Sequence, residues 1–288
     1  MWEALALTAA LCQVLRNTVM KRLGHSLDEY LAVWGRFTFL LPFAALFVLW
    51  QGVPEIKPGF VWACLLFGAC QTVSTIALSK ALKYGEISLV TALWKVSLLI
   101  LVGLGYVTLR EEPSLLGLGG ILISMAGVYL LNIRKAHIAW YAPLVVLFTD
   151  RGLRYTLLAA CFFAPSVVTI KWAMQLSDPY TGTLGGYIAA SLLVTPIILI
   201  TSRRHFSAIP RHGWAFLSFG FFAALTTISQ GKAYLLTLSS YVEAVKQVEI
   251  LFAMAIGVLV FGERQKVSEI SPGAVVMLAG VVLLSLAA

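Results

Sequence analysis

Charged side chains inside otherwise apolar segments are the residues of this sequence most able to do chemistry. Within such segments the basic residues are Arg16, Arg36, Lys80, Lys95, Lys171, Lys232 and Lys246. The acidic residues set against them are Glu243 and Glu249. A charge near the centre of a bilayer costs at least about 2.5 kcal/mol on insertion scales, so such residues usually face a protein interior or a wet cavity.

The depth of each cation in its segment separates two groups. Lys80, Lys171 and Lys232 lie within a turn or two of a segment end, and Arg16 is similar, so their long side chains can reach the membrane surface. Arg36 and Lys95 each lie about eight residues inside their segments, which is about 12 Å at 1.5 Å per residue. These two cations therefore favour a site rather than a surface role.

Polar neighbours at helical spacing extend the candidate site. Lys95 ends a stripe with Ser88 and Thr91 at i, i+3 and i+7, and Glu243, Lys246, Gln247 and Glu249 cluster within two turns. Gln71 and Gln230 belong to similar polar stripes. We expect substrate to be bound by Arg36, Lys95, Lys246, Gln247, Thr91, Gln71, Gln230, Lys80 and Lys232.

Internal ion pairs are the structural alternative to a binding site. Lys246 can meet Glu243 or Glu249 at i, i±3, and either glutamate could instead take up and release a proton, as buried carboxylates in membrane proteins often do. Ion pairs cannot neutralise every cation, because the basic residues within the apolar segments outnumber the acidic ones. An uncompensated cation in a dry bundle is too costly, so the surplus predicts a wet cavity and an anionic ligand bearing phosphate or carboxylate.

The composition indicates the elements that must position these residues. The 288 residues are 60% hydrophobic and 12% charged, whereas soluble domains carry about 25% charged residues. A spanning helix needs about 20 apolar residues. The sequence predicts an all-α membrane protein with ten transmembrane helices at about 2–22, 28–50, 59–83, 87–107, 114–132, 154–176, 180–201, 213–236, 241–261 and 270–287.

The two halves of the sequence resemble each other. A shift of 150 residues lays Lys21 on Lys171, and a shift of 152 lays Lys80 on Lys232 and Lys95 on Gln247. Because each half holds five spans, the second copy must be inverted, with a central cavity and the substrate near the midplane. We predict repeats at 1–133 and 154–288, joined by an interfacial linker at 134–153.

The loop charges are consistent with this inversion. Lys57 and Arg110 are the basic residues of one side, and the other side holds Lys21, Arg22, Lys83, Arg134, Lys135, Arg151, Arg154, Arg203, Arg204, Arg211, Arg264 and Lys266. The positive-inside rule places the richer side in the cytoplasm and both termini outside. The net charge is +8, but the sequence has no basic tail or basic helical face that could bind nucleic acid. We therefore expect the basic loops to contact anionic lipid and expect no nucleic-acid partner.

Motifs for catalysis, metals or cofactors are missing from the spans. The four histidines fall in predicted loops, and the four cysteines have no metal-ligand spacing. We therefore expect no enzymatic activity, no metal and no cofactor.

Two motifs carry a family resemblance over essentially the whole chain. They are ALKYGEISLVTAL, which starts at Ala81, and the pair LREEPSLLGLGGILISMAGVYLLN and FGERQKVSEISPGAVVMLAGVVLL, which start at Leu109 and Phe261. The chain resembles the drug/metabolite transporter superfamily, EamA-type. Sugar-phosphate translocators of that superfamily bind phosphate with basic residues on spans 4 and 9, where Lys95 and Lys246 stand.

The resemblance also has two departures. Many EamA-type proteins carry a proline about where Lys95 and Gln247 stand, so amino-acid-exporter chemistry does not carry over. Family members usually have cytoplasmic termini, which conflicts with the loop charges.

The sequence thus predicts a secondary transporter of the plasma (inner) membrane. It would move a small organic anion, possibly phosphorylated, by alternating access, as a monomer or homodimer. An exporter of neutral or zwitterionic metabolites is the first alternative. A lipid-phosphate or headgroup flippase is the second, and it would need a cavity that opens laterally between helices.

Overall fold

The computed structural model describes residues 1–23, 29–85, 87–136, 150–202, 213–261 and 267–287. These residues form helices joined by short turns, and no strand occurs in these ranges. The predicted interfacial linker falls mainly on 137–149, outside the described residues, and it remains a prediction. Next to these residues, α7 continues to Ala136 and α9 begins at Arg151.

Ten helical rods form the bundle, and several of them are interrupted. The first half contains α1 (Trp2–Leu23), α2 (Glu29–Thr38) with α3 (Leu41–Gln51), α4 (Phe60–Tyr84), α5 (Ile87–Trp94) with α6 (Val96–Leu109), and α7 (Leu115–Ala136). The second half contains α9 (Arg151–Gln175), α10 (Pro179–Thr201), α11 (Gly213–Leu236), α12 (Ser239–Val245) with α13 (Glu249–Phe261), and α14 (Val267–Ala287). The predicted all-α fold of ten helices is confirmed.

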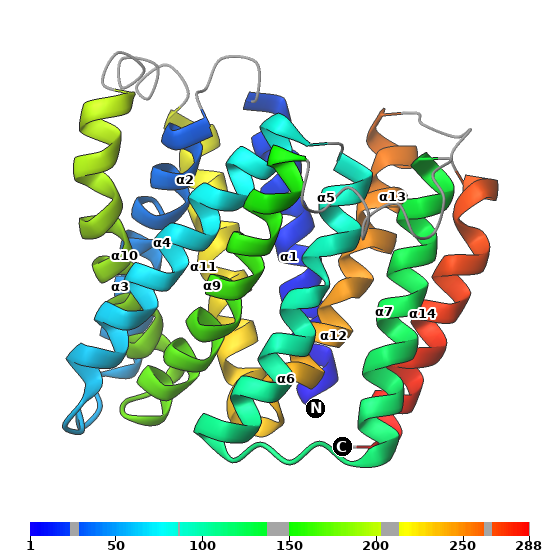
Figure 1. Cartoon of the computed structure of the whole chain (residues 1–288). Coiled ribbons are helices and arrows are strands. Elements are labelled where there is room, and N and C mark those ends of the chain that lie inside the picture. Colours follow the sequence, from blue (N-terminus) through cyan, green and yellow to red (C-terminus); the bar gives the residue numbers. More distant parts are fainter. Residues whose placement is uncertain (24–28, 86, 137–149, 203–212, 262–266, 288) are drawn as a thin grey trace.

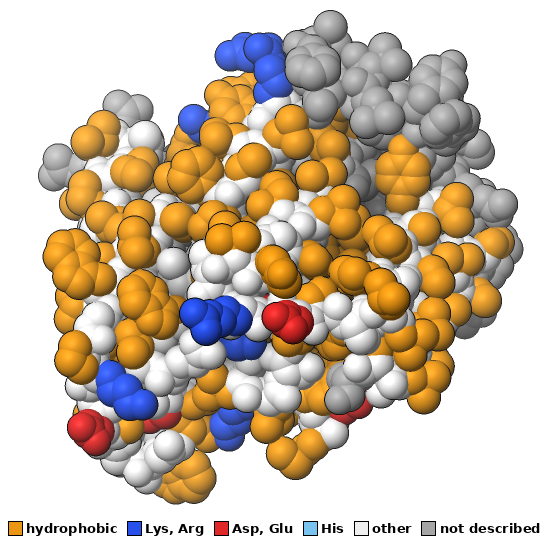
Figure 2. Space-filling view, turned by 60° about the horizontal axis from the view of Figure 1, so that its bottom comes forward, with side chains coloured by type: hydrophobic (Ala, Val, Ile, Leu, Met, Phe, Trp, Pro, Cys, Tyr) orange, Lys and Arg blue, Asp and Glu red, His pale blue; other side chains and the backbone are white. Residues whose placement is uncertain are grey.

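Five of the described rods are by themselves long and apolar enough to cross a membrane. They are Tyr30–Gln51, Phe60–Tyr84, Leu89–Leu109, Arg151–Gln175 and Pro179–Thr201, and shorter apolar helices cover Leu115–Leu131 and Pro272–Ala287. The protein surface agrees with this assignment, because hydrophobic side chains dominate the face in Figure 2 and charged ones are few. Leu192 and Ile200 on α10, for example, are exposed, as side chains in contact with lipid would be.

The halves have opposite orientations. Both termini lie at the lower end in Figure 1, where α1 begins, whereas its repeat partner α9 begins at the upper end. The helices pair symmetrically: α4 packs along α9, α1 packs along α11, and α7 packs along α14. Exchanging the halves converts the first pair into the second and leaves the third unchanged, as an inverted repeat requires.

Glycines allow the close approach of α7 and α14. A β-carbon on Gly280 would lie 2.3 Å from the backbone nitrogen of Ser124, and one on Gly127 would lie 2.3 Å from that of Met277. Small residues let membrane helices approach closely. Dispersion contacts then stabilise the pair, since the hydrophobic effect does not favour helix association within lipid. This pair therefore joins the two halves along one side of the bundle.

Aspartates define two helix starts in the second half. The Asp150 carboxylate accepts a hydrogen bond of 2.8 Å from the Leu153 N–H at the start of α9. The Asp178 carboxylate accepts bonds of 2.7 Å from the N–H groups of Tyr180 and Thr181 at the start of α10, where Pro179 is the first residue. Such caps satisfy backbone donors that the first turn leaves free.

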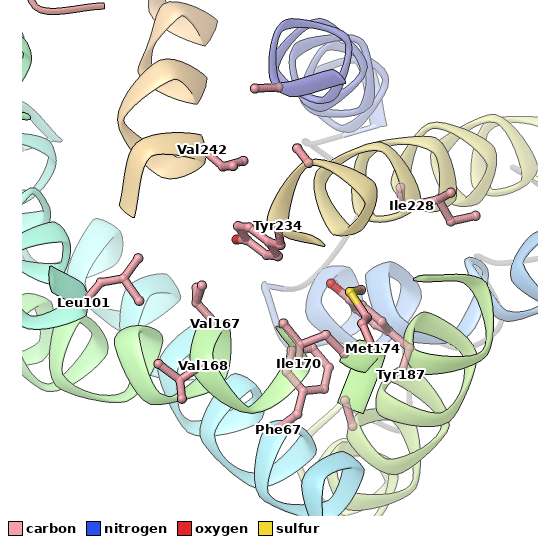
Figure 3. Close-up of a cluster of buried hydrophobic side chains, with 14 of the residues drawn as sticks. Phe67, Leu101, Val167, Val168, Ile170, Met174, Tyr187, Ile228, Tyr234 and Val242 are labelled. Atoms are coloured by element: carbon pink, nitrogen blue, oxygen red, sulfur yellow. The ribbon is translucent and has the colours of Figure 1, made fainter. Parts of the chain in front are cut away.

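The middle of the bundle holds a cluster of hydrophobic side chains. Phe67, Ile170, Met174, Tyr187 and Tyr234 point toward one another from α4, α9, α10 and α11 (Figure 3). These residues also line the lower part of the cavity described next. They fix the distances between the helices that carry the polar side chains of the site.

Candidate substrate-binding site

Two helices are interrupted at equivalent positions in the two halves. In the first half α5 ends at Trp94 and α6 begins at Val96, with Lys95 at the junction. In the second half the residues Lys246–Val248 form a 3-10 turn between α12 and α13. Discontinuous helices at the midplane are common at transport sites, and short 3-10 stretches within helices often mark hinges.

The sequence predicted spans at 87–107 and 241–261, and these interruptions lie within them; Leu89–Leu109 still forms one apolar rod long enough to cross a membrane. Neither junction contains a proline or glycine, the residues that usually signal a break. The sequence feature that the two interruptions share is a polar residue, since Lys95 and Gln247 occupy matching positions in the internal repeat.

A cavity of about 520 Å³ lies between the two halves at the level of these interruptions. Most of the predicted site residues line it: Arg36, Gln71, Thr91, Lys95, Gln230, Glu243, Lys246, Gln247 and Glu249. Its wall also includes Gln13, Arg16 and Asn17 of α1, which the sequence reasoning did not assign to the site. Their spacing of i, i+3 and i+4 is the polar stripe that would have identified them.

Lys246 is neutralised within the protein. Its ammonium group donates to Glu243 Oε1 at 3.1 Å and to Gln230 Oε1 at 2.9 Å. The Glu243 carboxylate also accepts from the Tyr234 hydroxyl at 2.5 Å and from Gln230 Nε2 at 2.7 Å. The internal ion-pair alternative is therefore confirmed for Lys246 and Glu243.

Of the two glutamates that could meet Lys246, Glu249 has a different partner. Gln13 Nε2 on α1 donates to Glu249 Oε2, and no ion pair with Lys246 occurs among the described residues. This bond connects α1 of the first half to the start of α13 in the second. The carboxylate remains on the cavity wall with its charge unpaired by a described cation.

Three cations on the cavity wall have no carboxylate partner within 4 Å among the described residues: Arg16, Arg36 and Lys95. Arg16 and Lys95 are only 5% and 9% exposed, and Arg16 donates to its neighbour Asn17 at 3.2 Å. Arg36 Nε is buried and has no hydrogen-bond partner, and the same holds for Gln247 Oε1. The cavity therefore holds four cations against two carboxylates, and its polar groups are incompletely satisfied.

Lys80 and Lys232 are not brought into the cavity. The Lys80 ammonium group lies 5.5 Å from the centroid of the Tyr155 ring, and that of Lys232 lies 4.7 Å from the Tyr180 centroid. An ammonium group over a tyrosine face gains electrostatic stabilisation from the ring. The structure thus gives these two lysines an aromatic partner rather than a place on the cavity wall.

Lys171 also differs from its predicted position. It was expected to reach the membrane surface, but it is 6% exposed, and its ammonium group donates to Glu111 Oε1 at 2.7 Å and to the Thr237 carbonyl at 2.8 Å. Glu111 Oε1 accepts further bonds from the backbone N–H of Ser239 at 3.0 Å and from its hydroxyl at 2.7 Å. We call Glu111, Lys171, Thr237 and Ser239 the Glu111 cluster.

The Glu111 cluster joins the two halves at the lower end of the bundle. Glu111 follows α6 of the first half, whereas Lys171 lies on α9 and Ser239 begins α12. Tyr241 adds a second link there, because its hydroxyl accepts from the Ser114 N–H at 3.1 Å. The two halves are thus bonded to each other below the cavity, whose lining continues in the other direction to Leu82 near the upper end of α4.

In the described part of the chain, ten helical rods in two inverted halves surround a polar central cavity, which is the architecture of a membrane carrier. The profile of the EamA-like transporter family matches residues 1–133 and 150–286. The chain therefore belongs to the EamA-like transporter family and is a multi-pass membrane transporter of small solutes. This family carries out transport rather than typical enzyme chemistry.

Similarity to solved structures supports the fold. One solved crystal structure is similar to this chain with a TM-score of 0.70, over 99% of this chain and 96% of that chain. The sequence identity is 14%, so this similarity concerns the fold alone. No curated protein matches the sequence.

Proposed function

We propose that this protein is a secondary transporter that carries a small organic anion across the plasma membrane by alternating access. The observation that carries the proposal is the set of cavity cations without carboxylate partners among the described residues: Arg16, Arg36 and Lys95. Cations this poorly compensated are costly in a membrane interior unless water or an anion solvates them.

The chemistry of these cations favours a phosphate or carboxylate group. An arginine presents several N–H donors in a planar fork that matches both anions, and a lysine adds a compact point charge. A neutral solute would leave the surplus charge uncompensated. The alternative in which the lysines only balance acids fits Lys246, which binds Glu243, better than Lys95, which has no carboxylate within 4 Å among the described residues.

Alternating access is supported by the asymmetry of the two ends. The Glu111 cluster closes the lower end through buried bonds between the halves, so that end opens only if these bonds break. The equivalent interruptions at Lys95 and at Lys246–Val248 would serve as hinges for this change. The charge of the loops assigns the upper end to the cytoplasm, and we extend this orientation to the proposal.

Binding measurements on neutralised variants test the anion proposal. We expect Lys95→Met and Arg36→Gln each to weaken binding of small phosphates to the purified protein by at least tenfold, because each loses a charge-assisted hydrogen bond. Lys80→Met is the matched control, since Lys80 does not line the cavity. Unchanged phosphate binding in both cavity variants would overturn the proposal in favour of a neutral or zwitterionic solute.

The two cavity carboxylates are the proposed proton acceptors of the transport cycle. Glu243 and Glu249 both line the cavity, where each can exchange protons with bound water. In proteoliposomes, the double variant Glu243→Gln/Glu249→Gln should transport without any response to an imposed pH gradient. Transport that still follows the gradient in this variant would exclude both glutamates as the coupling groups.

A further inference from the structure

A second pocket continues from the cavity between α2 and α4. It has a volume of about 470 Å³ and is bounded by α1, α2, α4 and α11. Its wall shares Arg16, Asn17, Arg36, Thr75, Leu78 and Leu82 with the cavity. The two spaces are therefore neighbouring compartments with a common wall, and we call the second one the α2–α4 pocket.

The α2–α4 pocket is cationic at the wall it shares with the cavity and mainly apolar elsewhere. Arg16 and Arg36 stand at the shared wall together with Leu78 and Leu82. The remainder is lined by Ala32, Val33, Ser79, Lys83 and Phe219. On α4 the lining positions run from Thr75 to Lys83 with helical spacing, which is one face of the helix over about 12 Å. Such a space matches a molecule with an anionic group at one end and a hydrocarbon chain at the other.

We propose that the transported anion is a single-chain amphiphile. Its anionic group binds Arg16, Arg36 and Lys95, and its hydrocarbon chain lies along α4 in the α2–α4 pocket. This inference rests on the proposed function and narrows its substrate class. A small anion without an apolar part would bind at the arginines but leave the accessible surface of Ala32, Leu78 and Leu82 facing water, so burial of a chain there adds affinity.

The burial of methylene groups sets the size of the expected effect. Each methylene moved from water into an apolar pocket strengthens binding by up to about fourfold. Ethyl, butyl and hexyl phosphate share one charged group and differ in chain length. In phosphatidylcholine nanodiscs that contain the full chain, we expect hexyl phosphate to bind at least tenfold more tightly than ethyl phosphate.

Variants of the pocket separate chain binding from simple partition into the bilayer. Ala32→Trp should fill the pocket and remove the advantage of hexyl over ethyl phosphate while ethyl phosphate still binds. Val73→Trp is the matched control, because Val73 lies on α4, is exposed and lines neither space. Leu82→Ser is a second variant at a half-exposed position, and it should reduce the dependence on chain length.

The outcomes distinguish this inference from the proposed function. If the three phosphates bind equally well and Ala32→Trp changes nothing, the amphiphile inference is wrong, while loss of binding in Arg36→Gln would still support anion transport. If no phosphate binds the unmodified protein, the anion proposal itself fails. If nanodiscs containing phosphatidic acid prevent hexyl phosphate from binding, the occupant is a two-chain membrane lipid, and the single-chain assignment is overturned.

Discussion

Two buried lysines in this protein, Lys171 and Lys95, have similar exposure and opposite surroundings. Lys171 is 6% exposed and binds the Glu111 carboxylate and the Thr237 carbonyl. Lys95 is 9% exposed, lines the cavity and has no carboxylate partner within 4 Å in the described part of the chain. Burial alone therefore does not identify a functional cation, and the set of partners does.

The difference follows from what each region must do. The Glu111 cluster holds the two halves together, so each of its charged groups finds its partner within the protein. The cavity must exchange one ligand for another, so part of its charge has to be left for the substrate. Lys246 lies between these extremes, because Glu243 compensates its charge while its side chain still lines the cavity.

The largest expected effect is the loss of stability in Lys171→Met. This change leaves the Glu111 carboxylate buried without its cation, and breaking a buried ion pair in this way costs about 3–5 kcal/mol. Thermal unfolding in detergent measures the effect. The double variant Lys171→Met/Glu111→Gln should recover part of the loss, and equal stability of Lys171→Met and the unmodified protein would remove the basis of the comparison.

Lys95→Met is the converse test. Because it removes a buried cation that has no carboxylate partner, its free energy of unfolding should fall by no more than about 1 kcal/mol or should rise. Phosphate binding in the same preparation should fall tenfold or more, as proposed above. A destabilisation as large as that of Lys171→Met would show that Lys95 is a structural residue whose partner lies elsewhere.

The sequence predicted the rods of this fold within a few residues, because apolar length is set by the bilayer rather than by tertiary contacts. Most of the residues that the sequence reasoning named for the site line the cavity. The sequence did not separate Lys171 from Arg16, since both lie near segment ends. The spatial neighbours of each cation determine whether it is paired or lines the cavity. Glu111, from a turn outside the spans, binds Lys171, whereas Arg16 lines the cavity. Distance from a helix end cannot carry that information.

Glu243→Gln tests the intermediate position of Lys246. The amide keeps acceptor capacity for Tyr234 but removes the negative charge beside the Lys246 ammonium group. The cavity then carries one more uncompensated charge, and we expect phosphate affinity to rise about fivefold, which is about 1 kcal/mol. Glu112→Gln, in an exposed position, is the charge-matched control and should leave affinity unchanged. A fall in affinity would mean that Glu243 binds the substrate directly.

Lys80→Met and Lys232→Met should give the smallest effects. Each removes an ammonium group from above a tyrosine ring, a contact worth about 0.5–1 kcal/mol at partly exposed sites. Thermal unfolding should fall by that amount, and phosphate binding should stay within twofold of the unmodified protein because neither lysine lines the cavity. These lysines match in the internal repeat, so a loss of binding in both would show that repeat symmetry, and not cavity lining, identifies the cations that reach the substrate during the cycle.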